Sequence, residues 1–165
     1  MDHDLWVYTF KEGLLSRVAH DLKLKASKAA WSIEGPTGPL EVRVPSDGLR
    51  VECAMEKGVE KPAVLSASDK AQIEKNLRKE VLETVRFPEI RFTAREISDA
   101  SVVGTLALHG VSREIRLPLR SQGDDIWAEF EVDQRDFRIK PYQAMLGALK
   151  VAPVVKVVVR VKRWK

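Results

Sequence analysis

The residues best suited to chemistry are three histidines and one cysteine, and their spacing does not favour catalysis. His3, His20 and His109 show neither the His-x-His nor the helical His-x-x-x-His spacing that metal sites use. Cys53 has no second cysteine with which to form an internal disulfide. The sequence also contains no Gly-x-Ser-x-Gly elbow and no glycine-rich phosphate loop. We therefore predict no catalytic residue, no metal site, no cofactor and no enzymatic activity.

The histidines are better explained by structural roles. An imidazole can satisfy the groups of a turn through both of its nitrogens, and His109 directly precedes Gly110, where a hairpin should turn. We expect a structural role for His20 as well, and we expect His3 to lie in a frayed end. An enzyme stays open as a minor hypothesis, which predicts polar groups that converge deep inside a pocket.

Composition and charge limit the class of protein. A chain of 165 residues with 44% apolar residues fits one domain over residues 1–165. The 28 basic and 24 acidic residues are interspersed, so the net charge of +4 predicts no nucleic-acid partner. The apolar runs are too short for a transmembrane segment, which needs about 20 residues. The start Met1-Asp2-His3-Asp4 shows no signal peptide, which predicts a cytoplasmic protein.

Apolar and polar residues alternate along most of the chain, as they do in strands with one buried face. The clearest case is the last strand, where the four valines of residues 155–161 share a face. Short links between such runs favour a mainly β fold, a single antiparallel eight-stranded β-barrel. Asp47-Gly48 indicates either a hairpin turn or, because Pro45 precedes it, a bend within one long strand.

Two other segments depart from this alternation. Over residues 66–84, Ile73, Leu77 and Val81 recur every four residues among charged side chains, which predicts one long amphipathic helix. Residues 141–150 are apolar but less regular, and they predict a short helix or a lid.

Two motifs in the chain resemble the paired signature of the YceI-like family. They are Phe87-Pro88-Glu89-Ile90-Arg91-Phe92 and Gly104-Thr105-Leu106-Ala107-Leu108-His109-Gly110-Val111-Ser112-Arg113. The segments from Val18 to Leu22 and from Asp133 to Ile139 resemble further parts of that family, so the resemblance covers most of the chain. It implies a lipocalin-like barrel with a long helix beside it, enclosing a tunnel that binds polyisoprenoids or amphiphilic fatty chains.

The chain departs from the pattern of that family in two places. Family members commonly carry a secretion signal and are often periplasmic or secreted, whereas this sequence shows no such signal. Where the family often has Phe-Phe-Asp after the helix, this chain has Val81-Leu82-Glu83. The second difference is expected to reshape the opening of the tunnel and so affect which ligand enters.

The function depends on whether the barrel is hollow. Several inward candidates are small, such as Ala26, Ala94 and Ala128, which favours a dry interior that takes one apolar guest. We predict non-covalent storage or transport of an isoprenoid or fatty-chain lipid. The predicted ligand-binding residues are Trp31, Phe92, Leu106, Leu108, Phe130, Tyr142, Met145, Leu146, Val157 and Val159. The alternative is a solid-core barrel that acts as a partner-binding or stress-related accessory protein, and a homodimer stays open.

Overall fold

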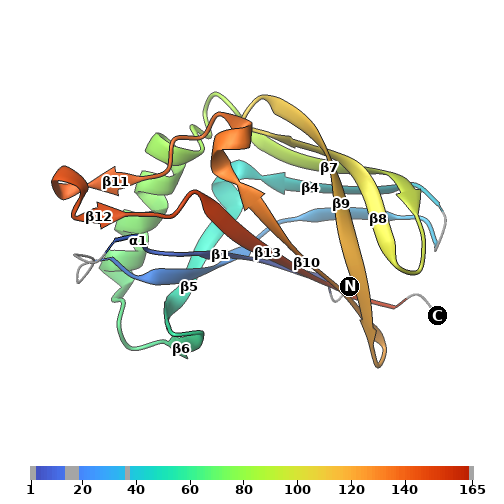
Figure 1. Ribbon diagram of the computed structural model, residues 1–165, viewed down its shortest axis with the longest axis horizontal. Helices are drawn as coiled ribbons and strands as arrows, with labels where there is room; N and C mark the ends of the chain where they lie inside the picture. The colour runs from blue at the N-terminus through green and yellow to red at the C-terminus, as the bar shows by residue number, and fades with distance from the viewer. Residues whose placement is uncertain (1–2, 14–18, 36–37, 164–165) are drawn as a thin grey trace.

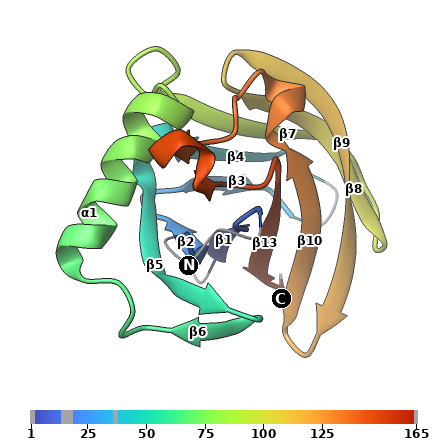
Figure 2. The same ribbon diagram turned by 60° about the vertical axis from the view of Figure 1, so that its left-hand side comes forward.

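One antiparallel sheet of eleven strands dominates the part of the chain that the computed structural model describes, residues 3–13, 19–35 and 38–163. Its strands are β1 (His3–Thr9), β2 (Asp21–Ala26), β3 (Ala30–Ile33), β4 (Leu40–Pro45), β5 (Leu49–Glu56), β6 (Val59–Lys61), β7 (Glu89–Ile97), β8 (Ser101–Leu108), β9 (Val111–Gln122), β10 (Asp125–Asp133) and β13 (Val154–Lys162). They are hydrogen-bonded in the order β3-β4-β7-β8-β9-β10-β13-β1-β2-β5-β6. The sheet curls into a half-barrel (Figures 1 and 2).

The mainly β antiparallel architecture predicted from the alternation is confirmed, but the prediction of eight strands is wrong. Two long strands are each divided by a bend, so that β2 is followed closely by β3 and β4 by β5. At the bends the Ser27 N–H donates to Gly48 O at 2.8 Å, and a Cβ on Gly48 would lie 2.7 Å from Ser27 O. Asp47-Gly48 therefore lies in a bend and not in a hairpin turn. The short strand β6, whose residues are all exposed, adds an edge that alternation does not reveal.

The predicted helix over residues 66–84 is shorter and less regular than expected. α1 spans only Ala67–Asn76, and the backbone then widens into a π-helical turn over Leu77–Val81. In this turn the Leu82 N–H donates to Leu77 O at 2.9 Å, one residue further along than in an α-helix. The prediction of one long helix is therefore wrong. No helix in the described part of the chain is long and apolar enough to cross a membrane.

Residues 141–150 form a small hairpin with a single 3-10 turn in place of a short helix, and the alternative of a lid stays a prediction. β11 (Gln143–Ala144) pairs with β12 (Leu149–Lys150) around the 3-10 turn Met145–Gly147. Met145 and Leu146 both have positive φ angles, 54° and 56°, in the left-handed region that large side chains rarely adopt. Figures 1 and 2 both place this β11–β12 hairpin beside α1.

Candidate functional site

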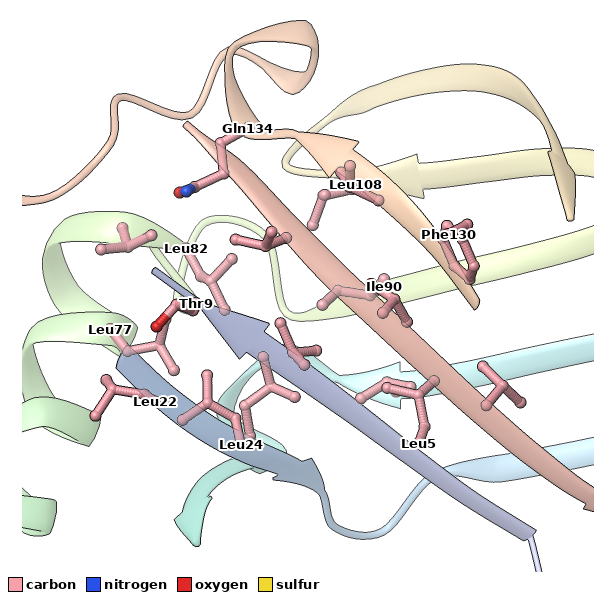
Figure 3. Close-up of a pocket in the computed structure, with 18 of the residues that line it drawn as sticks. Leu5, Thr9, Leu22, Leu24, Leu77, Leu82, Ile90, Leu108, Phe130 and Gln134 are labelled. Carbon is pink, nitrogen blue, oxygen red and sulfur yellow. The ribbon is translucent and has the colours of Figure 1, made fainter. Parts of the chain in front are cut away.

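The inner face of the half-barrel surrounds a cavity of about 600 Å³. Its wall consists mostly of aliphatic side chains that point inward from the strands, as the close-up in Figure 3 shows. β13 alone contributes Val155, Val157, Val159 and Val161. Small-molecule sites in proteins commonly have volumes of about 300–1,000 Å³ and largely apolar linings. The cavity therefore has the size and lining of a site for one apolar molecule.

Strand register explains why these side chains share one surface. Val157 on β13 lies opposite Val7 on β1 and Phe130 on β10, and all three face the cavity. The next residue, Val158, lies opposite Trp6 and faces outward, because successive side chains of a strand alternate between faces. The positions of β13 that line the cavity all carry valine, and valine is too small to fill the space between opposite walls.

The helical segment covers one side of the cavity. Ile73, Leu77 and Val81 all line it, so the face predicted from their spacing is the inward face even though the helix is irregular. Leu82, which directly follows the π-helical turn, also lines the cavity and is buried in the main core cluster with Val44. The wider turn brings Leu82 onto the wall that Leu77 and Val81 already form.

The charged residues of the cavity mark its opening. Apart from the Tyr142 phenol, the described lining contains three ionisable side chains, His20, Asp69 and Lys150, and all three residues are exposed. Together with α1 and the β11–β12 hairpin they form the end that we call the mouth. The Asp69 carboxylate accepts a hydrogen bond from the Ser66 backbone N–H at 2.9 Å, which lowers the pKa of Asp69 below its ordinary value. The Asp69 carboxylate at the mouth is therefore ionised near neutral pH.

A hydrogen bond ties the two elements of the mouth together. Asn76 Nδ2 at the end of α1 donates to the Tyr142 hydroxyl at 3.1 Å, and Gln72 Nε2 donates to Asn76 Oδ1 at 3.0 Å. All three residues line the cavity. The Tyr142 hydroxyl and the two amides thus form a neutral polar patch next to the charged residues of the mouth.

The family follows from the sequence taken with this fold. The model of the YceI-like domain matches residues 12–163, which is nearly the whole chain. This chain belongs to the YceI-like family. No curated protein gives a sequence match.

Solved structures with a similar fold differ strongly from this YceI-like chain in sequence. BcnA from Burkholderia cenocepacia has a TM-score of 0.63 at 11% identity, covering 96% of this chain and 94% of that one. A polyisoprenoid binding domain from Saccharophagus degradans, implicated in plant cell wall breakdown, has a TM-score of 0.61 at 14% identity, covering 96% and 91%. The YceI protein of Campylobacter jejuni has a TM-score of 0.56 at 13% identity, covering 87% and 86%. At these identities the likeness is one of fold.

The two YceI-like motifs meet in the structure at Phe87, His109 and Gly110, which do not line the cavity. The rings of Phe87 and His109 lie 4.4 Å apart, and Gly110 has a φ of 74° at a point where a Cβ would lie 2.7 Å from Phe87 Cε1. His109 Nδ1 lies 3.1 Å from Phe137 O, and its Nε2 lies 2.7 Å from Glu83 Oε2. The motifs therefore join the end of the helical segment to the β8–β9 turn and to the turn after β10.

The residues predicted to bind a ligand fall into two groups. Eight of the ten line the cavity: Trp31, Phe92, Leu106, Leu108, Phe130, Tyr142, Val157 and Val159. The other two, Met145 and Leu146, do not line the cavity: they are 64% exposed and fully exposed at the tip of the β11–β12 hairpin, and their contact with a ligand stays a prediction. For the eight, the position is as expected, and contact with a ligand stays a prediction.

Sequence reasoning missed part of the YceI-like cavity wall. In β1 the apolar residues occupy both parities, and the structure shows that Leu5, Val7 and Thr9 face inward. Gln134 also lines the cavity and was not expected there, because a polar residue was not sought in an apolar wall. The signal was present, since Gln134 lies two residues beyond the inward Val132 and continues the alternation of β10.

Other candidate residues lie outside the cavity wall. His3 belongs to β1 with its ring 5.2 Å from that of Trp31, so the prediction of a frayed end is wrong. Cys53 is buried in β5, and burial raises the pKa of its thiol, which disfavours the reactive thiolate. Within the described ranges, no group of three or more His, Cys, Asp or Glu residues could hold a metal ion. Val18, at the start of one family-like segment, lies outside the described residues.

Proposed function

We propose that this YceI-like protein binds one long apolar lipid, a polyisoprenoid or a fatty-chain amphiphile, non-covalently inside its half-barrel and stores or carries it. The observation that carries the proposal is the cavity of about 600 Å³ with its aliphatic wall. A carried lipid would enter at the mouth, between α1 and the β11–β12 hairpin. Its chain would then lie along the valines of β13.

Burial alone supplies enough free energy for such binding. Removing one methylene group from water is worth about 0.8 kcal/mol, so ten buried methylenes gain about 8 kcal/mol before the costs of ordering are subtracted. The wall needs no charged partner for this gain. Specificity then depends on the length of the cavity and on the few polar groups that line it.

Two further points favour this proposal over the alternatives. A cavity of this volume argues against a solid core that acts only through its outer surface. One protein with a similar fold is itself described as a polyisoprenoid binding domain, and family and fold together point to a binding protein and not to an enzyme.

The proposal is tested by recovering and then replacing the lipid. Organic extraction of the purified protein followed by mass spectrometry should yield a prenyl or fatty chain. After removal of lipid, titration with geranylgeraniol should change the fluorescence of Trp31, which lines the cavity. The matched control is Trp31→Phe, which should keep the uptake of radiolabelled geranylgeraniol and lose most of the fluorescence change. Preparations without lipid that also fail to take up geranylgeraniol and palmitic acid would contradict the proposal.

A further inference from the structure

Gln134 is the one glutamine among the buried residues, and it stands in an apolar wall. It begins the 3-10 turn Gln134–Phe137 directly after β10, and it is only 7% exposed. Figure 3 shows its side chain pointing into the cavity, near the aliphatic side chains of the wall. An amide in this position keeps little contact with bulk water, so its polar atoms need partners in the protein or in the cavity.

Backbone contacts fix the orientation of this amide. Gln134 Nε2 donates to Ala152 O at 3.2 Å, and the Gln134 backbone N–H donates to Pro153 O at 2.9 Å. Because a carbonyl oxygen can only accept, the amide nitrogen must face Ala152 and the amide oxygen must face away from it. No described residue donates a hydrogen bond to Oε1, and this oxygen is not fully buried, so the wall presents an acceptor that a molecule in the cavity can reach.

The charge of the surroundings limits what can occupy that acceptor. Lys150 is the one lysine in the described lining; the end of its side chain runs beside Gly147, 3.4 Å from where a Cβ would stand. It therefore extends along the exposed hairpin turn. An ionised carboxylate at Gln134 would have no proton to give to Oε1 and would lose its hydration in an apolar wall. A hydrocarbon would leave Oε1 unpaired.

We propose that Gln134 is a specificity-determining residue that accepts a hydrogen bond from the hydroxyl head group of the bound lipid. The preferred ligand is then a neutral long-chain or prenyl alcohol, with its hydroxyl at Gln134 and its chain along β13. This inference rests on the proposed function and adds the head group to it. Thr9, which also points into the cavity, is the competing position for that head group.

The test compares three ligands that differ only at the head: geranylgeraniol, its methyl ether and geranylgeranoic acid. The ether keeps the oxygen and the chain but has no hydrogen to donate. For the unchanged protein we expect the alcohol to bind about tenfold more tightly than the ether, the ratio given by one buried hydrogen bond. The acid should bind more weakly than the alcohol at neutral pH.

Three variants locate the effect. Gln134→Leu should bring the alcohol and the ether within about twofold of each other, because the acceptor is gone. Thr9→Val should keep the preference for the alcohol. Ser46→Ala is the matched control for stability, since the buried Ser46 hydroxyl donates to Phe87 O at 2.6 Å and does not line the cavity. If Gln134→Leu does not fold, Gln134→Met keeps the length of the side chain and replaces it.

The outcomes separate this inference from the proposed function. Equal binding of alcohol and ether by the unchanged protein overturns the role of Gln134 and leaves lipid binding intact. A preference that survives Gln134→Leu, or that disappears in Thr9→Val, overturns it as well. If none of the three ligands binds, the proposed function fails and the assignment of the head group fails with it.

Discussion

The two faces of β1, β13 and β10 carry different kinds of side chain. On the outer face, the rings of Trp6 and Trp127 stack at a centroid distance of 6.2 Å, and the Arg160 guanidinium lies about 6 Å from both rings. On the inner face, Val7 and Val157 are partners in adjacent strands, and both side chains line the cavity. Contacts on the outer face hold the strands to one another, so the inner face is free to leave volume for a guest.

The electrostatics of the two faces differ in the same way. Outside, burial would raise the pKa of the Asp4 carboxyl, but its hydrogen bonds and ion pairs with Lys25 and Arg160 outweigh burial and lower it. Burial would likewise lower the pKa of Lys23, whereas its contacts with Glu60 and neighbouring groups raise it to about 12. The outer face thus carries a network of ion pairs, whereas the described lining of the inner face carries charged side chains only at the mouth.

The largest effect should come from filling the inner face. Val157→Phe places a ring in the cavity, and displacing three or four methylenes of a guest should weaken lipid binding about a hundredfold. The matched control is Val158→Phe, one residue along β13 on the outer face, which should bind lipid as before. Isothermal titration with geranylgeraniol measures both, and circular dichroism checks that both fold. Equal losses of lipid affinity in the two variants would mean that the inner face is not the face that binds the lipid.

The second effect should appear on the outer face and in stability. Trp127→Ala removes the ring that stacks on Trp6 and should lower the free energy of unfolding by about 2–3 kcal/mol, less than a fully buried tryptophan would cost. Lipid affinity should change less than threefold. Urea unfolding and lipid titration on the same preparation give both numbers. A large loss of lipid affinity with little loss of stability would mean that the outer face, and not the inner face, contributes to lipid binding.

A smaller effect follows from the Asp4 ion pairs. Because the pKa of Asp4 is lower in the folded protein than in the unfolded chain, its stabilisation is present above about pH 4 and is lost as pH falls through the folded-state pKa. Asp4→Asn should therefore cost about 1 kcal/mol at pH 7 and less at pH 3. Urea unfolding at the two pH values measures the difference. The same loss of unfolding free energy at both pH values would show that the charge of the Asp4 carboxylate does not stabilise the fold.

The inward faces of the strands could be predicted from the sequence wherever alternation was clean. In β13 every second residue is valine, and in β10 Ala128 and Phe130 alternate with glutamates, so the inward parity was clear. β1 gave no such answer, because Trp6 is apolar yet lies outside under cationic side chains. Hydrophobicity alone does not separate an aromatic ring covered by cations from one that faces the interior.

Backbone geometry accounts for most of the remaining errors. The strand count was wrong because the bend at Gly48 depends on a close contact with Ser27, which alternation does not encode. The long helix was wrong because a π-helical turn keeps the same apolar spacing through Val81 while changing the path. The left-handed backbone of Met145 and Leu146, at the exposed tip of the β11–β12 hairpin, is likewise a feature that their apolar character does not predict.

The smallest effect should come from the tip of the β11–β12 hairpin. Leu146→Ser changes a fully exposed side chain, so the free energy of unfolding should change by less than about 0.5 kcal/mol and lipid affinity by less than twofold. The matched variant Leu149→Ser, in β12 of the same hairpin, alters the cavity wall and should weaken binding by more than fivefold. A tenfold loss in Leu146→Ser would mean that the tip closes over the bound lipid, because only a changed hairpin position could bring Leu146 into contact with it.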